Sequence, residues 1–241
     1  MGKFITYISN DLKIIFRDKT MIIMFFLPLI FIFLCRLGLP IISRYVPQII
    51  EYYWIIIASF CILSGAMPAF LTAFLMLDEK DENITEVLKI IPFPYTKLIT
   101  YRIIFLMFSS YVFSNIFLFF NGLFFYPIHK IIMVSILVSF VPALLTLGII
   151  PFAKNKIEGV TLFKGFNSLL FIPIIAFFVP ENWQYVFGIV PFFWAFDLLS
   201  GNIPNHEIVV RFIVGLLVNI SYLLILTHFF IKRTTIMSNQ K

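Results

Sequence analysis

The side chains able to do chemistry in this sequence are few, and five of its twelve acids gather in one place. Residues 77–97, LDEKDENITEVLKIIPFPYTK, hold five acids and three lysines, although only 12% of the whole sequence is charged. Eight ionised groups would cost on the order of 20 kcal/mol at the centre of a bilayer. This stretch must therefore lie in water, where its charges can form ion pairs with another part of the chain or with a partner.

Catalytic and metal-binding patterns are missing elsewhere. The sequence has no phosphate-binding G-x-x-x-x-G-K-[ST] loop, no H-E-x-x-H and no G-x-S-x-G, and His129, His206 and His228 are far apart. Cys35 and Cys61 both fall in apolar runs, where a thiol behaves as a small hydrophobe. We therefore expect no catalytic residue, no metal site and no cofactor in this chain.

The elements that position the charged stretch are membrane spans. Hydrophobic residues make up 61% of the 241 positions and include 32 Phe, too much apolar surface for one soluble core. A helix needs about 20 mostly apolar residues to cross a bilayer. This criterion predicts an all-α polytopic membrane protein, a single transmembrane domain over 1–241, with six spans at 21–43, 54–77, 102–125, 131–152, 162–179 and 210–231.

The distribution of basic residues predicts the orientation, because cytoplasmic segments of membrane proteins are enriched in Lys and Arg. With the N-terminus inside, fourteen of the eighteen Lys and Arg residues fall on the cytoplasmic side. The four that fall outside are Arg36, Arg44, Lys130 and Arg211. Both termini are thus expected inside the cell, and the net charge of +6 suits a membrane surface and needs no nucleic acid.

Span one contains an unusual charge. Arg36 follows only fifteen apolar residues, so its guanidinium must either reach toward the membrane surface or meet a partner.

A short amphipathic helix is expected inside the charged stretch. Asn83, followed three residues later by Glu86, is typical of an N-cap with its capping-box partner. Apolar residues then recur with helical spacing until Pro92 ends the pattern. They are Ile84, Val87, Leu88 and Ile91. A helix of about two turns is not stable alone, so its apolar face must dock on lipid headgroups or on another protein.

Two further segments flank the spans. Residues 1–20 have an apolar and a charged face, which fits either a helix lying in the membrane interface or a simple solvated anchor. Residues 180–208 are too apolar for a free loop and too proline-broken for a crossing. With Trp183, Tyr185 and Trp194, this outer segment predicts short re-entrant helices between spans five and six.

Polar groups within the spans are hydroxyls and amides, with no Asp or Glu near a midplane, so coupling to protons or sodium is not expected. Gly65, Ala69 and Ala73 form a small-residue stripe on span two, which permits close helix packing within the chain or at a dimer seam. Outward-side charges could bind a substrate at the exit or simply be solvated. These are Arg36, Glu51, Glu181, Asp197 and Glu207.

Four motifs together resemble the ABC type-2 permease family, the membrane subunits of ATP-driven transporters. They are IIFRDK at 14–19, EKDENITEVLKIIPFP at 79–94, AKNKIEG at 153–159 and VPFFWAFDLL at 190–199. The resemblance covers nearly the whole chain. It implies six spans with both ends inside, an interfacial N-terminal helix at 1–20, a cytoplasmic coupling loop at 78–100 and an extracellular re-entrant segment at 180–208.

The same resemblance implies how the transporter is driven. The helix after span two would be a coupling helix in a groove of a separate ABC ATPase subunit, which carries ATP and Mg. The contact residues would be Glu79, Glu82, Ile84, Glu86, Val87, Leu88, Ile91 and Pro92. A second permease copy, identical or paralogous, and membrane lipid are the other expected partners, in a bacterial cell membrane.

The resemblance favours an exporter of a hydrophobic or amphipathic drug, antimicrobial peptide or toxin. Several alternatives stay open: a lipid or glycan flippase, an importer, and an immunity or assembly protein that binds a peptide at the membrane without moving it. A membrane-embedded enzyme would need clustered His, Asp or Glu inside spans, which the sequence lacks.

Overall fold

The computed structural model describes residues 11, 13–82, 95–201 and 203–239. Every regular element in these ranges is helical. The α-helices are α2 (Lys19–Phe33), α3 (Leu39–Tyr45), α4 (Tyr53–Asp81), α6 (Tyr95–Phe120), α7 (Ile128–Ile149), α8 (Lys156–Leu169), α9 (Ile172–Ala176), α10 (Glu181–Gln184), α11 (Phe193–Leu199) and α12 (Asn205–Asn239). A π-helix, η1 (Leu34–Gly38), and two 3-10 helices, η2 (Pro47–Tyr52) and η3 (Tyr185–Ile189), complete the set.

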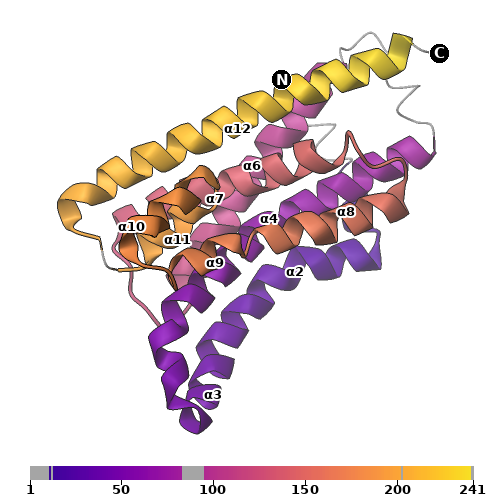
Figure 1. Cartoon of the computed structure of the whole chain (residues 1–241). Helices are drawn as coiled ribbons and strands as arrows, with labels where there is room; N and C mark the ends of the chain where they lie inside the picture. Colours follow the sequence, from indigo (N-terminus) through magenta and orange to yellow (C-terminus); the bar gives the residue numbers. More distant parts are fainter. Residues whose placement is uncertain (1–10, 12, 83–94, 202, 240–241) are drawn as a thin grey trace.

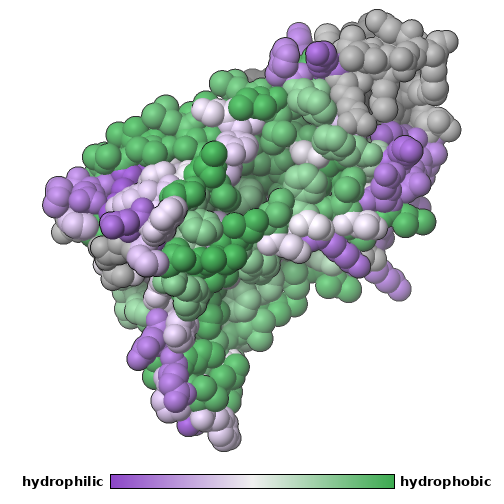
Figure 2. Space-filling view, viewed as in Figure 1, coloured by the Kyte–Doolittle hydropathy of each residue, from purple (hydrophilic) through white to green (hydrophobic). Residues whose placement is uncertain are grey.

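Six helical stretches of the described chain are long and apolar enough to cross a membrane, which confirms the predicted fold class. They are Met21–Tyr45, Pro47–Asp81, Lys97–Phe120, Ile128–Ile149, Lys156–Ala176 and His206–Lys232. Large apolar side chains stay exposed along them, as expected for surfaces that face lipid. The visible face is mainly apolar between polar groups at its two ends (Figure 2).

The second and fourth spans form the centre of the bundle. In the most apolar window of each, 78% and 83% of the residues are buried, against 17% to 28% in the other four spans. Helices α2, α6, α8 and α12 lie around α4 and α7 (Figure 1). Any displacement of α4 is therefore passed directly to the core of the molecule.

The small-residue stripe on α4 lies inside this core. Gly65, Ala69 and Ala73 are all buried within the chain. A Cβ added to Gly65 would lie 2.2 Å from Val138 Cγ1 and 2.8 Å from Ser110 Oγ, so α4 approaches α7 and α6 as closely as glycine allows. The stripe thus packs α4 against the chain's own helices.

The segment between spans five and six folds back into the bundle. All seven residues of α11 are buried, and α11 packs on α4, α7 and α12. Trp194 lies between two glycines. Its Nε1 donates to the Gly188 carbonyl at 2.9 Å. On the other side, a Cβ added to Gly215 would lie only 2.6 Å from the Cβ of Trp194, so α12 approaches α11 closely. This arrangement agrees with the predicted re-entrant helices.

Span one leaves the bundle toward its end. Helix α3 and the 3-10 helix η2 that follows it extend away from α6, α7, α8 and α12 (Figure 1), and the π-helix η1 precedes α3. Arg36 lies in η1, is exposed, and packs its aliphatic carbons over Gly122, whose φ of +75° makes the turn after α6. Among the residues that the structure describes, Arg36 has no ion-pair partner, so it takes the exposed alternative.

The boundaries of the charged stretch differ from the sequence prediction. Helix α4 continues to Asp81 and α6 begins at Tyr95, so only the central part of the expected loop at 78–100 separates the two helices. Asp78–Asp81 can extend the helix because each of these residues has a partner elsewhere in the chain. The predicted capped helix from Asn83 to Ile91 lies outside the described residues, as does most of the predicted interfacial segment at 1–20.

Candidate functional site

The end of α4 that carries the charged stretch is bound to three other parts of the chain. We call Asp78–Asp81, their partners Arg102, Ala153 and Lys156, and Asp11, which also pairs with Arg102, the α4-end network. The Lys156 ammonium contacts both carboxylate oxygens of Asp78 at 2.7 and 2.9 Å. Asp81 Oδ2 accepts from the Lys156 backbone N–H at 3.0 Å, and Lys80 Nζ donates to the Ala153 carbonyl.

Arg102 is the most buried charge of this network, with a side chain only 7% exposed. Its guanidinium donates to both oxygens of Glu79 at 2.6 and 2.7 Å, and to both oxygens of Asp11 at 3.0 Å. Two bidentate ion pairs on one guanidinium give a fixed geometry that a lysine would not reproduce. Arg102 therefore joins α4, α6 and the N-terminal segment, on both sides of residues 83–94.

The beginning of α8 is fixed against the same end of α4. Asn155 caps α8 by accepting from the Glu158 N–H at 2.8 Å, and Glu158 Oε2 accepts from the Lys154 N–H at 2.9 Å. A Cβ on Gly159 would lie 2.1 Å from Leu77 Cδ1, so α8 packs closely on α4. The N-x-x-E pattern that predicts a cap at Asn83 also occurs at Asn155 and could have indicated this helix start.

The structure places only two of the predicted ATPase-contact residues. Glu79 faces inward to Arg102, so its carboxylate is already paired within the chain. Glu82 is exposed at the end of α4. The remaining six lie outside the described residues. They are Ile84, Glu86, Val87, Leu88, Ile91 and Pro92.

A second charged cluster lies at the opposite end, where α11 meets α12. Arg211 Nη1 donates to both oxygens of Asp197 at 2.9 and 3.1 Å, and Nη2 donates to Glu207 Oε2 at 2.8 Å. Burial raises the pKa of Asp197 above its ordinary value, Glu207 adds to the increase, and Arg211 partly offsets it. The prediction that Asp197 is a solvated or substrate-facing charge is wrong, because its side chain is buried and paired with Arg211.

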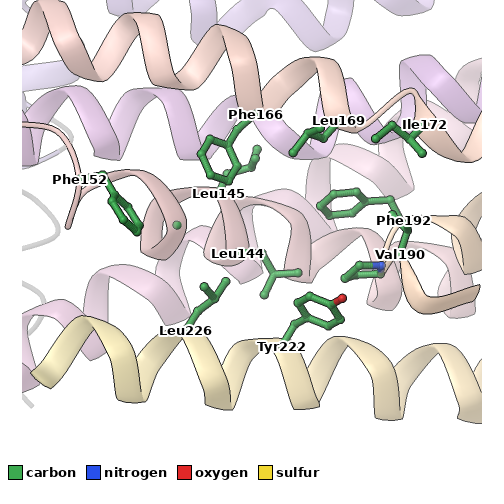
Figure 3. Close-up of a pocket in the computed structure, with 12 residues that line it drawn as sticks. Leu144, Leu145, Phe152, Phe166, Leu169, Ile172, Val190, Phe192, Tyr222 and Leu226 are labelled. Carbon is green, nitrogen blue, oxygen red and sulfur yellow. The ribbon is translucent and has the colours of Figure 1, made fainter. Parts of the chain in front are cut away.

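An apolar groove of about 440 Å³ lies between α8 and α12, with α7 as its floor (Figure 3). Its lining includes four aromatic rings, Phe152, Phe166, Phe192 and Tyr222. The aliphatic part of the lining comes from Leu144, Leu145, Gly148, Leu169, Ile172, Val190, Pro191 and Leu226. No sequence pattern pointed to this groove, because its walls come from α7, α8, α9, α12 and the turn at 190–192.

Over the described ranges, no group of three or more His, Cys, Asp or Glu side chains is arranged to hold a metal ion. The two charged clusters instead use Arg and Lys as counter-ions.

The chain is similar to known proteins over most of its length. Residues 11–227 match the family described as Rv2686c-like, fluoroquinolones export permease protein Rv2686c-like. Two Mycobacterium tuberculosis proteins, fluoroquinolones export permease protein Rv2686c of strain H37Rv and MT2760 of strain CDC 1551, are each 26% identical over 195 residues, covering 77% of this chain and 77% of theirs. No solved structure matches the chain. These relatives agree with the resemblance to an ABC type-2 permease.

Proposed function

We propose, because this chain belongs to the Rv2686c-like fluoroquinolones export permease family, that it is the membrane subunit of an ATP-driven exporter of drug-like molecules. The chain is a non-enzymatic membrane permease, as its family and its six apolar helices indicate. A separate ABC ATPase subunit would bind ATP and Mg and supply the energy. A second permease copy would complete the passage.

The observation that best supports this proposal is the α4-end network. Arg102 and Glu79 join α4 to α6 directly beside residues 83–94, and Lys156 joins α4 to α8. A protein that pushes on residues 83–94 would therefore move three spans as one unit rather than bend a loose loop. Since α4 lies at the centre of the bundle, the movement would reach the passage.

The orientation follows from the distribution of charge. We place the α4-end network and both termini on the cytoplasmic side, where fourteen of the eighteen Lys and Arg residues then fall. The ends of α4 and α12 and the beginnings of α2 and α8 lie at the same end of the bundle (Figure 1). The Asp197–Arg211 pair would then lie on the outer side.

The substrate class is proposed from the relatives. Both mycobacterial relatives are named fluoroquinolones export permease proteins, and we extend to this chain the export of amphipathic aromatic drugs. Away from their ends, the spans of the described chain offer hydroxyls, amides and aromatic rings rather than carboxylates. Such surroundings suit a substrate that dissolves in the membrane.

Transport in inverted vesicles tests the proposal. Vesicles that contain the chain and its co-purifying ATPase subunit are expected to accumulate a fluorescent fluoroquinolone when ATP is added, and not with a non-hydrolysable ATP analogue. The absence of ATP-dependent accumulation across fluoroquinolones, peptides and lipid analogues would refute an exporter.

A pair of variants tests the contact with the ATPase. Placing charges on the predicted apolar face, by Val87→Asp with Leu88→Asp, is expected to abolish co-purification of the ATPase because the partner would have to bury them unpaired. Thr85→Asp, on the predicted polar face, is the control and should leave co-purification intact. Undiminished association in the double variant would contradict the coupling role.

A further inference from the structure

We infer that the groove between α7, α8 and α12 is a binding site for a flat, uncharged aromatic molecule with a hydrogen-bond acceptor, which enters sideways from the membrane. A volume of about 440 Å³ lies within the range of roughly 300 to 1,000 Å³ typical of sites for drug-sized ligands. In assigning this site to the transported molecule, the inference rests on the proposed function.

Both ends of the groove are closed by protein. At one end Phe152 stacks on Phe229 of α12, with ring centroids 5.6 Å apart and planes at 17°. At the other end Pro191 belongs to the turn before α11, and Asn219 of α12 holds it by donating to the Pro191 carbonyl at 3.2 Å. Neither aqueous side therefore offers a direct route along the helices.

The side of the groove is open. Helices α8 and α12 both pack on α7, and the lining residue Leu169 on the rim remains 45% exposed. Figure 3 shows Phe166 and Leu169 reaching in from α8 and Tyr222 and Leu226 from α12. Since these spans face lipid, the occupant comes from the bilayer, which favours an uncharged molecule over an ion.

The lining selects an aromatic occupant. Four rings from four different segments surround the groove, and aromatic pairs gain about 0.5 to 1.5 kcal/mol beyond the burial of their area. The hydroxyl of Tyr222 is the one polar side-chain group in the lining. Among the residues that the structure describes, it has no hydrogen-bond partner. A phenol in apolar surroundings is stabilised by an acceptor, and a ligand carbonyl would supply one.

Under the proposed orientation, the groove faces the inner half of the membrane, because Phe152 ends it just before Ala153 and the α4-end network. The turn at 190–192 closes its outer end and continues directly into the buried helix α11. A substrate bound in the groove would therefore contact the turn at 190–192, which together with α11 closes the route to the outer side.

Equilibrium binding to the full-length chain in lipid nanodiscs tests the site with two fluorophores. Acridone is flat and uncharged and carries one ring carbonyl, whereas anthracene has the same ring size and no carbonyl. Tyr222→Phe is expected to weaken acridone binding by about 3- to 10-fold and to leave anthracene binding unchanged. An equal effect of this variant on both fluorophores, or on neither, would overturn the role of the hydroxyl.

A matched pair on α12 tests the place of binding. Leu226→Trp fills the groove and should abolish binding of both fluorophores, whereas Leu224→Trp lies on the lipid-facing side, where Leu224 is 65% exposed, and should bind both normally. Normal binding in Leu226→Trp would overturn the site. So would efficient disulfide cross-linking of Leu226→Cys between two chains, because a second copy would then fill the groove.

The outcomes separate this inference from the proposed function. If the fluorophores respond as expected but no fluoroquinolone is exported, the groove is a binding site and the proposed export function is refuted. If export proceeds at the normal rate in Leu226→Trp, the export function is supported and the groove is not the substrate site of the exporter.

Discussion

Arg102 joins segments that are 91 and 23 residues away in the sequence, Asp11 and Glu79. Replacing it by Met would leave two carboxylates, 19% and 18% exposed, facing each other without a counter-ion. Removing one partner of a buried ion pair typically costs about 3 to 5 kcal/mol, and we expect about 3 kcal/mol here because the carboxylates are partly exposed. Thermal unfolding in nanodiscs measures the loss.

Two controls accompany this Arg102 variant. Arg102→Lys retains the charge but not the two bidentate contacts, so it should fall between the wild type and Arg102→Met. Arg44→Met removes an exposed charge and should be neutral. Equal stability of wild type and Arg102→Met would show that the network does not hold these segments together.

The raised pKa of Asp197 implies that the free energy of unfolding depends on pH. Its pKa in the folded chain is raised above the ordinary 3.8, so the folded state binds a proton more readily than the unfolded state does. The stability that this group contributes is fully present below 3.8 and is lost as the pH rises through the folded pKa. Acidification from neutral pH should therefore stabilise the wild type relative to Asp197→Asn, which cannot titrate.

The difference in melting temperature between the wild type and Asp197→Asn, followed from neutral pH downward, measures this effect without interference from the other carboxylates. If acidification instead lowered the melting temperature of the wild type relative to Asp197→Asn, the attraction of Arg211 rather than burial would determine the pKa of Asp197.

At the scale of the elements, close packing of α4 depends on Gly65. Gly65→Ala would place a methyl group 2.2 Å from Val138 Cγ1 and 2.8 Å from Ser110 Oγ, so α4 and α7 must separate or side chains must shift. Overpacking of this kind costs about 1 to 3 kcal/mol. Gly165→Ala on α8 meets nothing within 4 Å and should be neutral or slightly stabilising.

Unfolding of both glycine variants in the same nanodiscs provides the comparison. If Gly65→Ala were as stable as Gly165→Ala, the central helices would have room that the structure does not show.

The helices were predictable from sequence because a span needs only length and apolar composition. All six predicted spans overlap those observed, and the outer segment at 180–208 folds back as short helices. The ends were less accurate, because Asp78–Asp81 remain helical through partners that the sequence does not bring together. Periodicity also cannot tell whether a small-residue stripe packs within the chain or at a dimer seam. The structure shows that Gly65 packs within the chain, against α6 and α7.

The candidate sites were harder to predict than the spans. The α4-end network joins Asp11, Glu79 and Arg102 through tertiary contacts, so the sequence showed an excess of charge without its pairing. Asp197 resembled a surface acid because its burial depends on α11 lying inside the bundle. The groove has no local signal, since α7, α8, α12 and the turn at 190–192 each contribute a few apolar residues.

At the scale of the whole molecule, charge is separated into two ends. One end holds the α4-end network beside residues 83–94, and the other holds the Asp197–Arg211 pair, where α11 meets α12. The apolar groove lies between them, next to the central helix α7. This arrangement fits a permease that receives force at one end and releases its substrate at the other.

The most direct test of this account is the side of the membrane on which the end of α4 lies. Glu82 is exposed, and Cys35 and Cys61 are buried, so a thiol introduced by Glu82→Cys can be labelled selectively once both native cysteines are replaced by Ala. Glu51 is exposed and is predicted to lie on the outer side, so Glu51→Cys is a control that should be labelled from the opposite side of the membrane.

The account predicts that a membrane-impermeant thiol reagent labels Glu82→Cys only in inverted vesicles and labels Glu51→Cys in intact cells. Labelling of Glu82→Cys in intact cells would place the α4-end network outside the cell, beyond the reach of any ATPase, and would contradict the account.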